Sequence, residues 1–134
     1  MRLQELTGII IECAMKVHSE LGAGLLESVY EICLAHELRK HGVRVETQVP
    51  LPVVYDGTKL EAGFRIDMIV EGSVVLEIKA IESVLDVHKA QTITYLKLSG
   101  KPVALLINFN VAHLKDGIGR FENRARAAAA GGKI

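Results

Sequence analysis

The sequence contains no tryptophan and few other aromatic residues, with three tyrosines and three phenylalanines among its 134 residues. An apolar core therefore has to be built from leucine, isoleucine, valine and alanine. The hydrophobic fraction of 49% is high enough for this and excludes a largely disordered chain. Two cysteines, Cys13 and Cys33, are too few for a disulfide framework and match no zinc spacing. Both lie within helical apolar patterns, so we expect reduced core residues.

Long apolar runs and a signal peptide are also missing. No uninterrupted apolar stretch has the length of a membrane span, and the start, Met1-Arg2-Leu3-Gln4-Glu5, lacks the features of a secretory signal. We therefore expect no membrane partner and a cytoplasmic protein. The length predicts one domain over residues 1–134, of which about 122–134 form a frayed tail.

The formal net charge is zero, which by itself speaks against a nucleic-acid partner. The charges are nevertheless unevenly distributed. After Gly100 only two acidic residues occur, against six basic ones: Lys101, Lys115, Arg120, Arg124, Arg126 and Lys133. This pattern suits a carboxylate-rich metal site beside a basic phosphate-binding rim, and it equally suits an ordinary charged tail.

The periodicity of apolar residues divides the chain into helices and strands. Helical spacing predicts three helices, near residues 3–20, 25–40 and 83–98. Alternation and compact apolar runs predict strands at 43–49, 60–70, 73–80 and 103–107, with a short final element at 114–121. Pro50 and Pro52 mark an edge strand or its frayed end. Asp56-Gly57 and Glu71-Gly72 are turn signals, so we expect an α/β domain with a hairpin-fed sheet.

Glu77 and Lys79 interrupt an apolar run that reads as a buried strand. Residues two apart on a strand share one face, so this carboxylate and this ammonium point the same way. Two charges on a central strand are costly to bury without partners. Taken alone, the pair is explained either by a salt bridge at an exposed strand end or by a functional site.

Asp67 is the second interruption. If the turn at 71–72 joins adjacent antiparallel strands, Asp67 and Glu77 lie at similar distances from it and therefore close together. Neighbouring carboxylates repel each other and need neutralisation. Mg²⁺ or Mn²⁺ would provide it, because both prefer carboxylate oxygens, and Lys79 alone would neutralise one of the two.

Two further groups have ordinary explanations when taken singly. Glu27 stands in the first turn of a helix, where a carboxylate interacts favourably with the helix dipole. Gln91 and Tyr95 are spaced i and i+4 and share one helix face, with His88 one turn earlier. Core packing of the tyrosine and solvation of the glutamine would account for that face.

In combination these residues resemble the GxxExxY protein family, which is assigned to the PD-(D/E)xK nuclease superfamily. The resemblance extends from about Leu6 to Ile118. Its motifs occur in the family's order: Gly24-x-x-Glu27-x-x-Tyr30, Val54-Tyr55-x-Gly57, Gly63-Phe64-Arg65-Ile66-Asp67, Glu77-Ile78-Lys79-Ala80, His88-x-x-Gln91-x-x-x-Tyr95-Leu96-Lys97 and Leu106-Ile107-Asn108-Phe109. One departure is Ile66, which stands where the superfamily has proline.

The resemblance implies a restriction-endonuclease-like αβββαβ core, a mixed β-sheet flanked by helices, with an extra N-terminal helix. It also implies a site that binds Mg²⁺ or Mn²⁺ and activates water for phosphodiester hydrolysis. The implied catalytic residues are Asp67, Glu77, Lys79, Glu27 and Gln91. The implied metal ligands are Asp67, Glu77, the Ile78 carbonyl and Glu27. Residues expected at the substrate are Tyr95, Tyr30 and His88.

Three functions follow from this resemblance. The first is a metal-dependent nuclease acting on DNA more than on RNA. The second is a non-catalytic module that binds nucleic acid or protein on the same fold. The third is a defence or repair accessory that acts only with a partner, since a small neutral domain offers little surface to hold a duplex. We also expect a homodimer through the apolar first helix as a candidate assembly.

Overall fold

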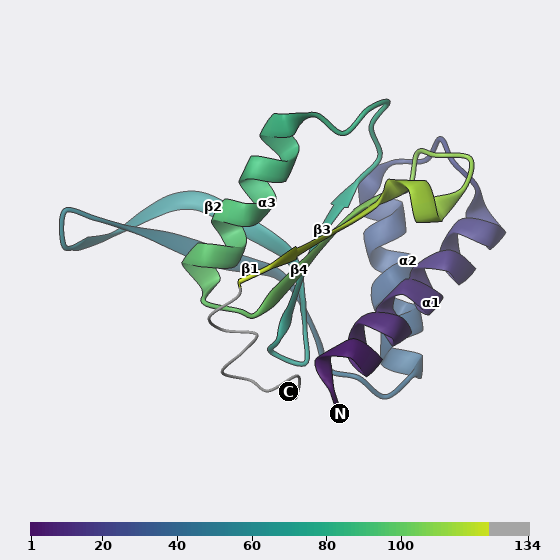
Figure 1. Ribbon diagram of the computed structural model, residues 1–134, viewed down its shortest axis with the longest axis horizontal. Coiled ribbons are helices and arrows are strands. Elements are labelled where there is room, and N and C mark those ends of the chain that lie inside the picture. Colours follow the sequence, from purple (N-terminus) through teal and green to yellow (C-terminus); the bar gives the residue numbers. More distant parts are fainter. Residues whose placement is uncertain (124–134) are drawn as a thin grey trace.

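Helices cover both faces of a five-stranded β-sheet in the computed structural model, which describes residues 1–123 (Figure 1). The elements in chain order are α1 (Leu3–Leu21), α2 (Glu27–Lys40), β1 (Val45–Tyr55), β2 (Thr58–Val70), β3 (Val74–Lys79), α3 (Asp86–Ser99), β4 (Val103–Asn108), the 3₁₀ helix η1 (Leu114–Gly117) and β5 (Ile118–Glu122). The predicted αβββαβ order with an extra N-terminal helix is confirmed.

The strand order in the sheet is β1-β2-β3-β4-β5. Only β3 and β4 run parallel, with α3 as the crossover between them, and the other neighbours are antiparallel. Nearly every residue of β3 and β4 is buried, as their apolar runs predicted. The carboxylate of Glu77 and the ammonium of Lys79 therefore belong to the middle strand of the sheet.

The two faces of the sheet have separate cores. Helices α1 and α2 cover one face and contribute about half of the larger core, whereas α3 covers the other face and contributes Tyr95 and Leu96 to a smaller one (Figure 1). The apolar side of α1, including Leu6, Ile10 and Cys13, is buried in the larger core. This side of α1 is therefore covered by the same chain, and the dimer through the first helix stays a prediction. None of the helices within residues 1–123 has the length and apolarity that a membrane span requires.

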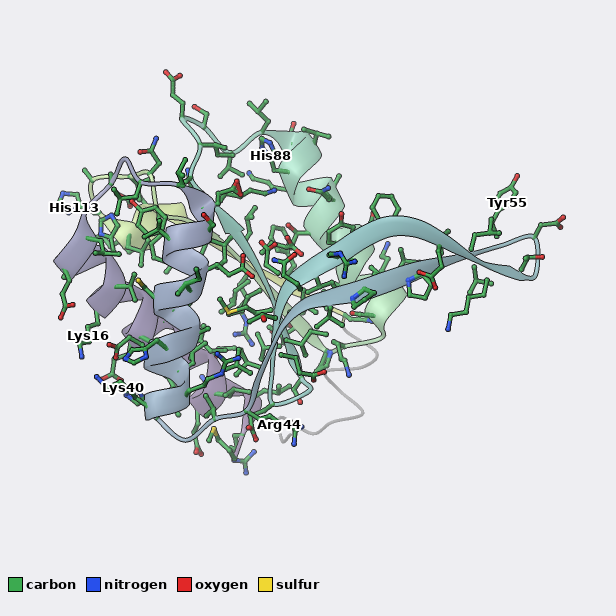
Figure 2. The ribbon with its side chains drawn as sticks, turned by 180° about the vertical axis from the view of Figure 1, so that it is seen from behind. Lys16, Lys40, Arg44, Tyr55, His88 and His113 are labelled. Atoms are coloured by element: carbon green, nitrogen blue, oxygen red, sulfur yellow. The ribbon has the colours of Figure 1, made fainter. Side chains whose placement is uncertain are left out.

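The β1–β2 hairpin extends beyond the rest of the molecule as a long arm, with Tyr55 near its tip (Figure 2). Strand β1 continues through Pro50 and Pro52, and the pairing register shifts between Leu51 and Val53. Because β1 lies at the edge of the sheet, the missing N–H groups of the two prolines are tolerated there. Of the two interpretations of these prolines, the edge strand is therefore the correct one. At the other end of the chain, Glu122 still pairs with Val103 and the Asn123 N–H donates to the Pro102 carbonyl at 2.9 Å, so these first two residues of the predicted tail are held to the sheet. The rest of the predicted tail, 124–134, lies outside the described residues.

Candidate functional site

The sheet is locally distorted at Asp67. On the β1 side, Thr47 pairs with Met68 and Val49 with Ile66, but the intervening Gln48 has a left-handed backbone with φ of 52°. On the β3 side, regular pairing ends at Met68 and Leu76. A left-handed conformation is unfavourable for a residue with a side chain, so the surrounding structure has to hold it. Asp67 therefore lies where β2 separates from both of its neighbours.

The carboxylate of Asp67 bridges the gap that opens between β2 and β3. Its Oδ2 accepts a hydrogen bond of 2.7 Å from the backbone N–H of Ile78. The carboxylate thus takes the place of the β2 backbone carbonyl that would accept this bond in a regular ladder. Extending the register of Met68 with Leu76 by one residue brings Asp67 opposite Glu77. The proximity that the turn at 71–72 predicted is thus found in the structure.

Glu77 is the most unusual ionisable group of the described chain. Its side chain is only 4% exposed, and its Oε1 is buried with no hydrogen-bond partner. Burial, followed by the neighbouring charge of Asp67, raises the pKa of Glu77 to about 9, and the positive charge of Lys79 opposes this only in part. In the metal-free protein at neutral pH, Glu77 is therefore protonated beside Asp67.

Lys79 lies at the end of β3, partly exposed, next to Asn108 of β4. Within residues 1–123 it forms no ion pair, because the three ion pairs there involve other residues. The explanation by a salt bridge at an exposed strand end therefore fails for this strand. The ammonium acts on Glu77 through space, as the lowering contribution of Lys79 to the pKa of Glu77 indicates.

The backbone of β3 presents one carbonyl to the same gap. In a strand the N–H and C=O of one residue point to the same side. The Lys79 carbonyl accepts from the Phe109 N–H on the β4 side, while the Ile78 N–H points to Asp67 on the β2 side. The Ile78 carbonyl therefore points toward the space where the β2–β3 ladder has ended.

Tyr30 lies in the core, and its side chain leaves no exposed surface for the substrate contact that the resemblance implies. The side chain is fully buried and stacks on Phe109 with a ring-centroid distance of 4.5 Å. Its hydroxyl donates to the Gly22 carbonyl at 2.6 Å and accepts from the Leu25 N–H at 3.1 Å. Tyr30 thus fixes the start of α2, through Phe109, to the strand end that carries Lys79.

Of the carboxylates on α2, the structure draws attention to Glu31, which the motif pattern did not select. Glu31 is partly buried, and its Oε1 accepts a hydrogen bond of 2.7 Å from Gln48 Nε2. Burial raises its pKa, the hydrogen bond from Gln48 opposes this, and the charges of Asp67 and Glu27 raise it further. Glu27 is exposed at the first residue of α2. The electrostatic coupling of Glu31 to Asp67 depends on how the two elements pack, so no sequence pattern would have selected Glu31.

Helix α3 supplies the remaining residues. Gln91 is exposed, and its Nε2 donates to the Tyr95 hydroxyl at 3.1 Å, as the i, i+4 spacing predicted. The ring of Tyr95 is only 7% exposed and packs in the smaller core. Burial raises the pKa of the Tyr95 hydroxyl, and the charge of Glu77 and, to a smaller extent, that of Asp67 raise it further. The Tyr95 hydroxyl is therefore electrostatically coupled to both carboxylates. Contact of this buried ring with a substrate is limited to the hydroxyl edge.

His88 stands at the N-terminal end of α3 (Figure 2). Its Nδ1 accepts a hydrogen bond of 2.9 Å from the Leu85 N–H and thereby caps the helix. In the neutral ring the proton is consequently on Nε2, which is the nitrogen left for another partner. The helix cap is its observed role, and a substrate contact through Nε2 stays a prediction.

The oxygen atoms around the gap between β2 and β3 suit a divalent cation. Asp67, Glu77 and the Ile78 carbonyl offer oxygen donors around one gap, and the orphaned Oε1 of Glu77 requires a partner. No group of three or more histidine, cysteine, aspartate or glutamate side chains is gathered in metal-binding geometry within the described part of the chain. An all-protein cage is therefore not formed. Two carboxylates with a carbonyl fit Mg²⁺, which keeps several waters, better than they fit Zn²⁺.

Comparison with known proteins gives one family. The sequence profile described as the PD-(D/E)XK nuclease superfamily matches residues 4–121, which is most of the chain. Searches among curated proteins and among solved structures give no match.

Proposed function

Because this chain belongs to the PD-(D/E)XK nuclease superfamily, we propose that it is a metal-dependent nuclease that hydrolyses phosphodiester bonds, in DNA rather than RNA. The observation that supports this most is the buried Glu77 beside Asp67, with one carboxylate oxygen unpartnered. A buried carboxyl group that is held neutral beside a second carboxylate, with an oxygen unpartnered, has a cost in desolvation that a structural role does not need. We also place the chain in the GxxExxY family, on the motif Gly24, Glu27 and Tyr30.

Each residue has a definite role in this proposal. Asp67, Glu77 and the Ile78 carbonyl hold Mg²⁺ or Mn²⁺, and Glu77 gives up its proton when the cation binds. The cation supplies charge neutralisation and electrophilic assistance at the phosphate. Lys79, which forms no ion pair with any residue in the range 1–123, orients the attacking water and stabilises the negative charge that develops on the phosphate.

The helices complete the site. The exposed amide of Gln91 reaches the phosphate, while its bond to the Tyr95 hydroxyl fixes its position. Between Glu27 and Glu31 of α2, Glu31 is the one whose charge is coupled to Asp67, and Gln48 holds it in place. We therefore assign the contribution of α2 to Glu31 first and to Glu27 second.

Cleavage by Lys79→Ala tests the proposed mechanism. We expect cleavage to fall about 10²- to 10³-fold, because one group that stabilises the developing charge is lost. Mn²⁺ affinity should stay unchanged or rise slightly, since a positive charge is removed near the carboxylates. The measurements are single-turnover cleavage of single- and double-stranded DNA and RNA in Mg²⁺ or Mn²⁺, and calorimetric titration with Mn²⁺.

The outcomes separate the three functions. Wild-type cleavage that stops with EDTA and falls in Lys79→Ala supports the nuclease. No cleavage of any polymer and no Mn²⁺ binding would contradict it and favour a non-catalytic binding module. Cleavage that begins only after addition of a co-purified protein would point to the partner-dependent accessory.

Two carboxylates on one helix provide a matched comparison. Glu31→Gln is expected to weaken Mn²⁺ binding about 10- to 100-fold, the size typical of losing a supporting group around a metal. Glu27→Gln, an identical change one turn earlier at an exposed position, is expected to have a much smaller effect. Calorimetry on the two variants decides, and a larger loss in Glu27→Gln would reverse the assignment.

A further inference from the structure

Phe64 presents an unusual surface close to the site. It lies on β2 three residues before Asp67, a separation of about 10 Å along a strand. Its side chain is 41% exposed, although phenylalanine is normally buried and the chain has few aromatic residues. Residues three apart on a regular strand face opposite sides, but the ring of Phe64 lies beside Tyr95 of α3, whose pKa is raised by the charges of Glu77 and Asp67. The ring is therefore on the α3 side together with these carboxylates, within reach of a nucleotide next to a phosphate bound at Asp67.

The ring of Phe64 is supported from one side. Tyr95 lies beside it with a ring-centroid distance of 5.9 Å and an interplanar angle of 51°, a favourable tilted arrangement. Tyr95 is itself buried and tied to Gln91 by a hydrogen bond. A ring held in this way loses little conformational entropy when something stacks on its free side.

The charges near the site do not favour binding through phosphates. Asp67, Glu77 and Glu31 are acidic, and Lys79 is the one basic side chain assigned to the site. Arg120, expected at a basic rim, is paired with the Glu122 carboxylate and donates to the Thr7 hydroxyl. Arg65, exposed on β2 and donating to the Gln48 carbonyl, is a further basic side chain near Asp67. Since phosphate contacts supply most non-specific affinity for a duplex, so few basic groups leave a larger share of the affinity to contacts with the bases.

We propose that Phe64, supported by Tyr95, is a stacking platform for an unpaired nucleobase, so that the substrate is single-stranded or locally unpaired nucleic acid. This inference rests on the proposed nuclease function and names its substrate class. In a duplex the base faces are covered by their neighbours, whereas an unpaired base has a free face that stacks on an aromatic ring irrespective of sequence. The stacked base holds the adjacent phosphate over the gap between Asp67 and Glu77.

The test measures binding without cleavage. Labelled single-stranded DNA and its duplex are titrated by fluorescence anisotropy in EDTA with wild type, Phe64→Ala and Phe64→Leu. We expect wild type to prefer the single strand and Phe64→Ala to lose about 5- to 100-fold of that affinity, with little change for the duplex. Phe64→Leu keeps an apolar side chain without the aromatic face and should recover only part of the loss.

Two controls locate the effect. Tyr55→Ala removes an aromatic residue that is more exposed than Phe64, 71% against 41%, at the far end of the same arm, and should leave binding nearly unchanged. A single strand with abasic sites keeps every phosphate and should bind wild type and Phe64→Ala equally.

Phe64→Trp introduces the sole tryptophan of the protein, and its fluorescence should be quenched by the single strand and not by the duplex.

The inference is overturned if Phe64→Ala binds the single strand like wild type, if Phe64→Leu is indistinguishable from wild type, or if Tyr55→Ala loses as much affinity. Failure of the nuclease proposal looks different. In that case Mg²⁺ and Mn²⁺ give no cleavage with any variant, while the Phe64-dependent binding in EDTA is still observed.

Discussion

Glu77→Gln is expected to raise the free energy of unfolding of the metal-free protein at pH 7 by about 3 kcal/mol. The pKa of Glu77 is raised from 4.5 to about 9, mainly by burial and then by Asp67. Between those two values the folded state binds more protons than the unfolded state, so stability falls as pH rises. From 4.5 to 7 each pH unit costs about 1.4 kcal/mol, which gives the expected difference. Glutamine keeps the shape and avoids this cost.

The pH dependence is the decisive part of this prediction. The difference between Glu77→Gln and wild type should be small below pH 4.5, grow up to about pH 9 and then level off. Other ionisable groups titrate alike in both proteins and cancel in the difference. Urea unfolding in EDTA, followed by circular dichroism, measures it at several pH values. Glu46→Gln, an exposed carboxylate on β1, is the control.

Addition of Mn²⁺ should reverse the order of stability. Wild type gains stability through binding, and Glu77→Gln gains much less because it has lost a ligand. Mn²⁺ affinity of wild type should also increase with pH, since the proton on Glu77 has to leave. A stability difference that does not change with pH would contradict the raised pKa, and an unchanged response of Glu77→Gln to Mn²⁺ would contradict its role as a ligand.

Asp67→Asn is expected to reduce cleavage about 10³-fold or more, because removal of one member of a cooperating set disables the whole set. Asparagine keeps an oxygen that accepts the hydrogen bond from the Ile78 N–H, so the junction of β2 and β3 stays intact. The substitution therefore removes a charge with little change of shape. Single-turnover cleavage and Mn²⁺ calorimetry are the measurements.

Asp56→Asn at the hairpin turn is the matched control for this substitution. It makes the same chemical change at an exposed position with φ of 52°, which asparagine tolerates. Its cleavage and unfolding should equal those of wild type. Asp67→Asn activity within tenfold of wild type would remove Asp67 from the proposed site.

The Asp67–Glu77 pair was predictable because a tight turn fixes an antiparallel register. With Glu71-Gly72 recognised as the turn, counting places Asp67 and Glu77 within one residue of facing each other. The structure has a turn of three residues, 71–73, which pairs Val70 with Val74 and so brings Asp67 opposite Glu77. The Gln91–Tyr95 bond was predictable for a similar reason, since i and i+4 are neighbours on a helix. Both predictions depend on local geometry.

Positions that depend on how one element packs on another were not predictable. Tyr30 belongs to a motif, but its burial against Phe109 depends on the docking of α2 on the end of β4. The same docking turns Glu31 toward Asp67 and leaves Glu27 exposed. A helical sequence fixes which residues share a face, but the neighbouring elements decide which face points to the site.

By itself, the sequence determined the order of the elements and the proximity of Asp67 to Glu77, because periodicity and tight turns act over a few residues. The prolines left an edge strand and a frayed strand end open, and the strand order of the sheet decided that β1 is the edge strand. Only the tertiary structure decided how deeply Glu77 is buried, that one of its oxygens has no partner, and that Asp67 closes the gap to Ile78. These properties depend on packing between segments far apart in the chain. The raised pKa of Glu77 comes from that packing, because desolvation is imposed by everything that surrounds the group.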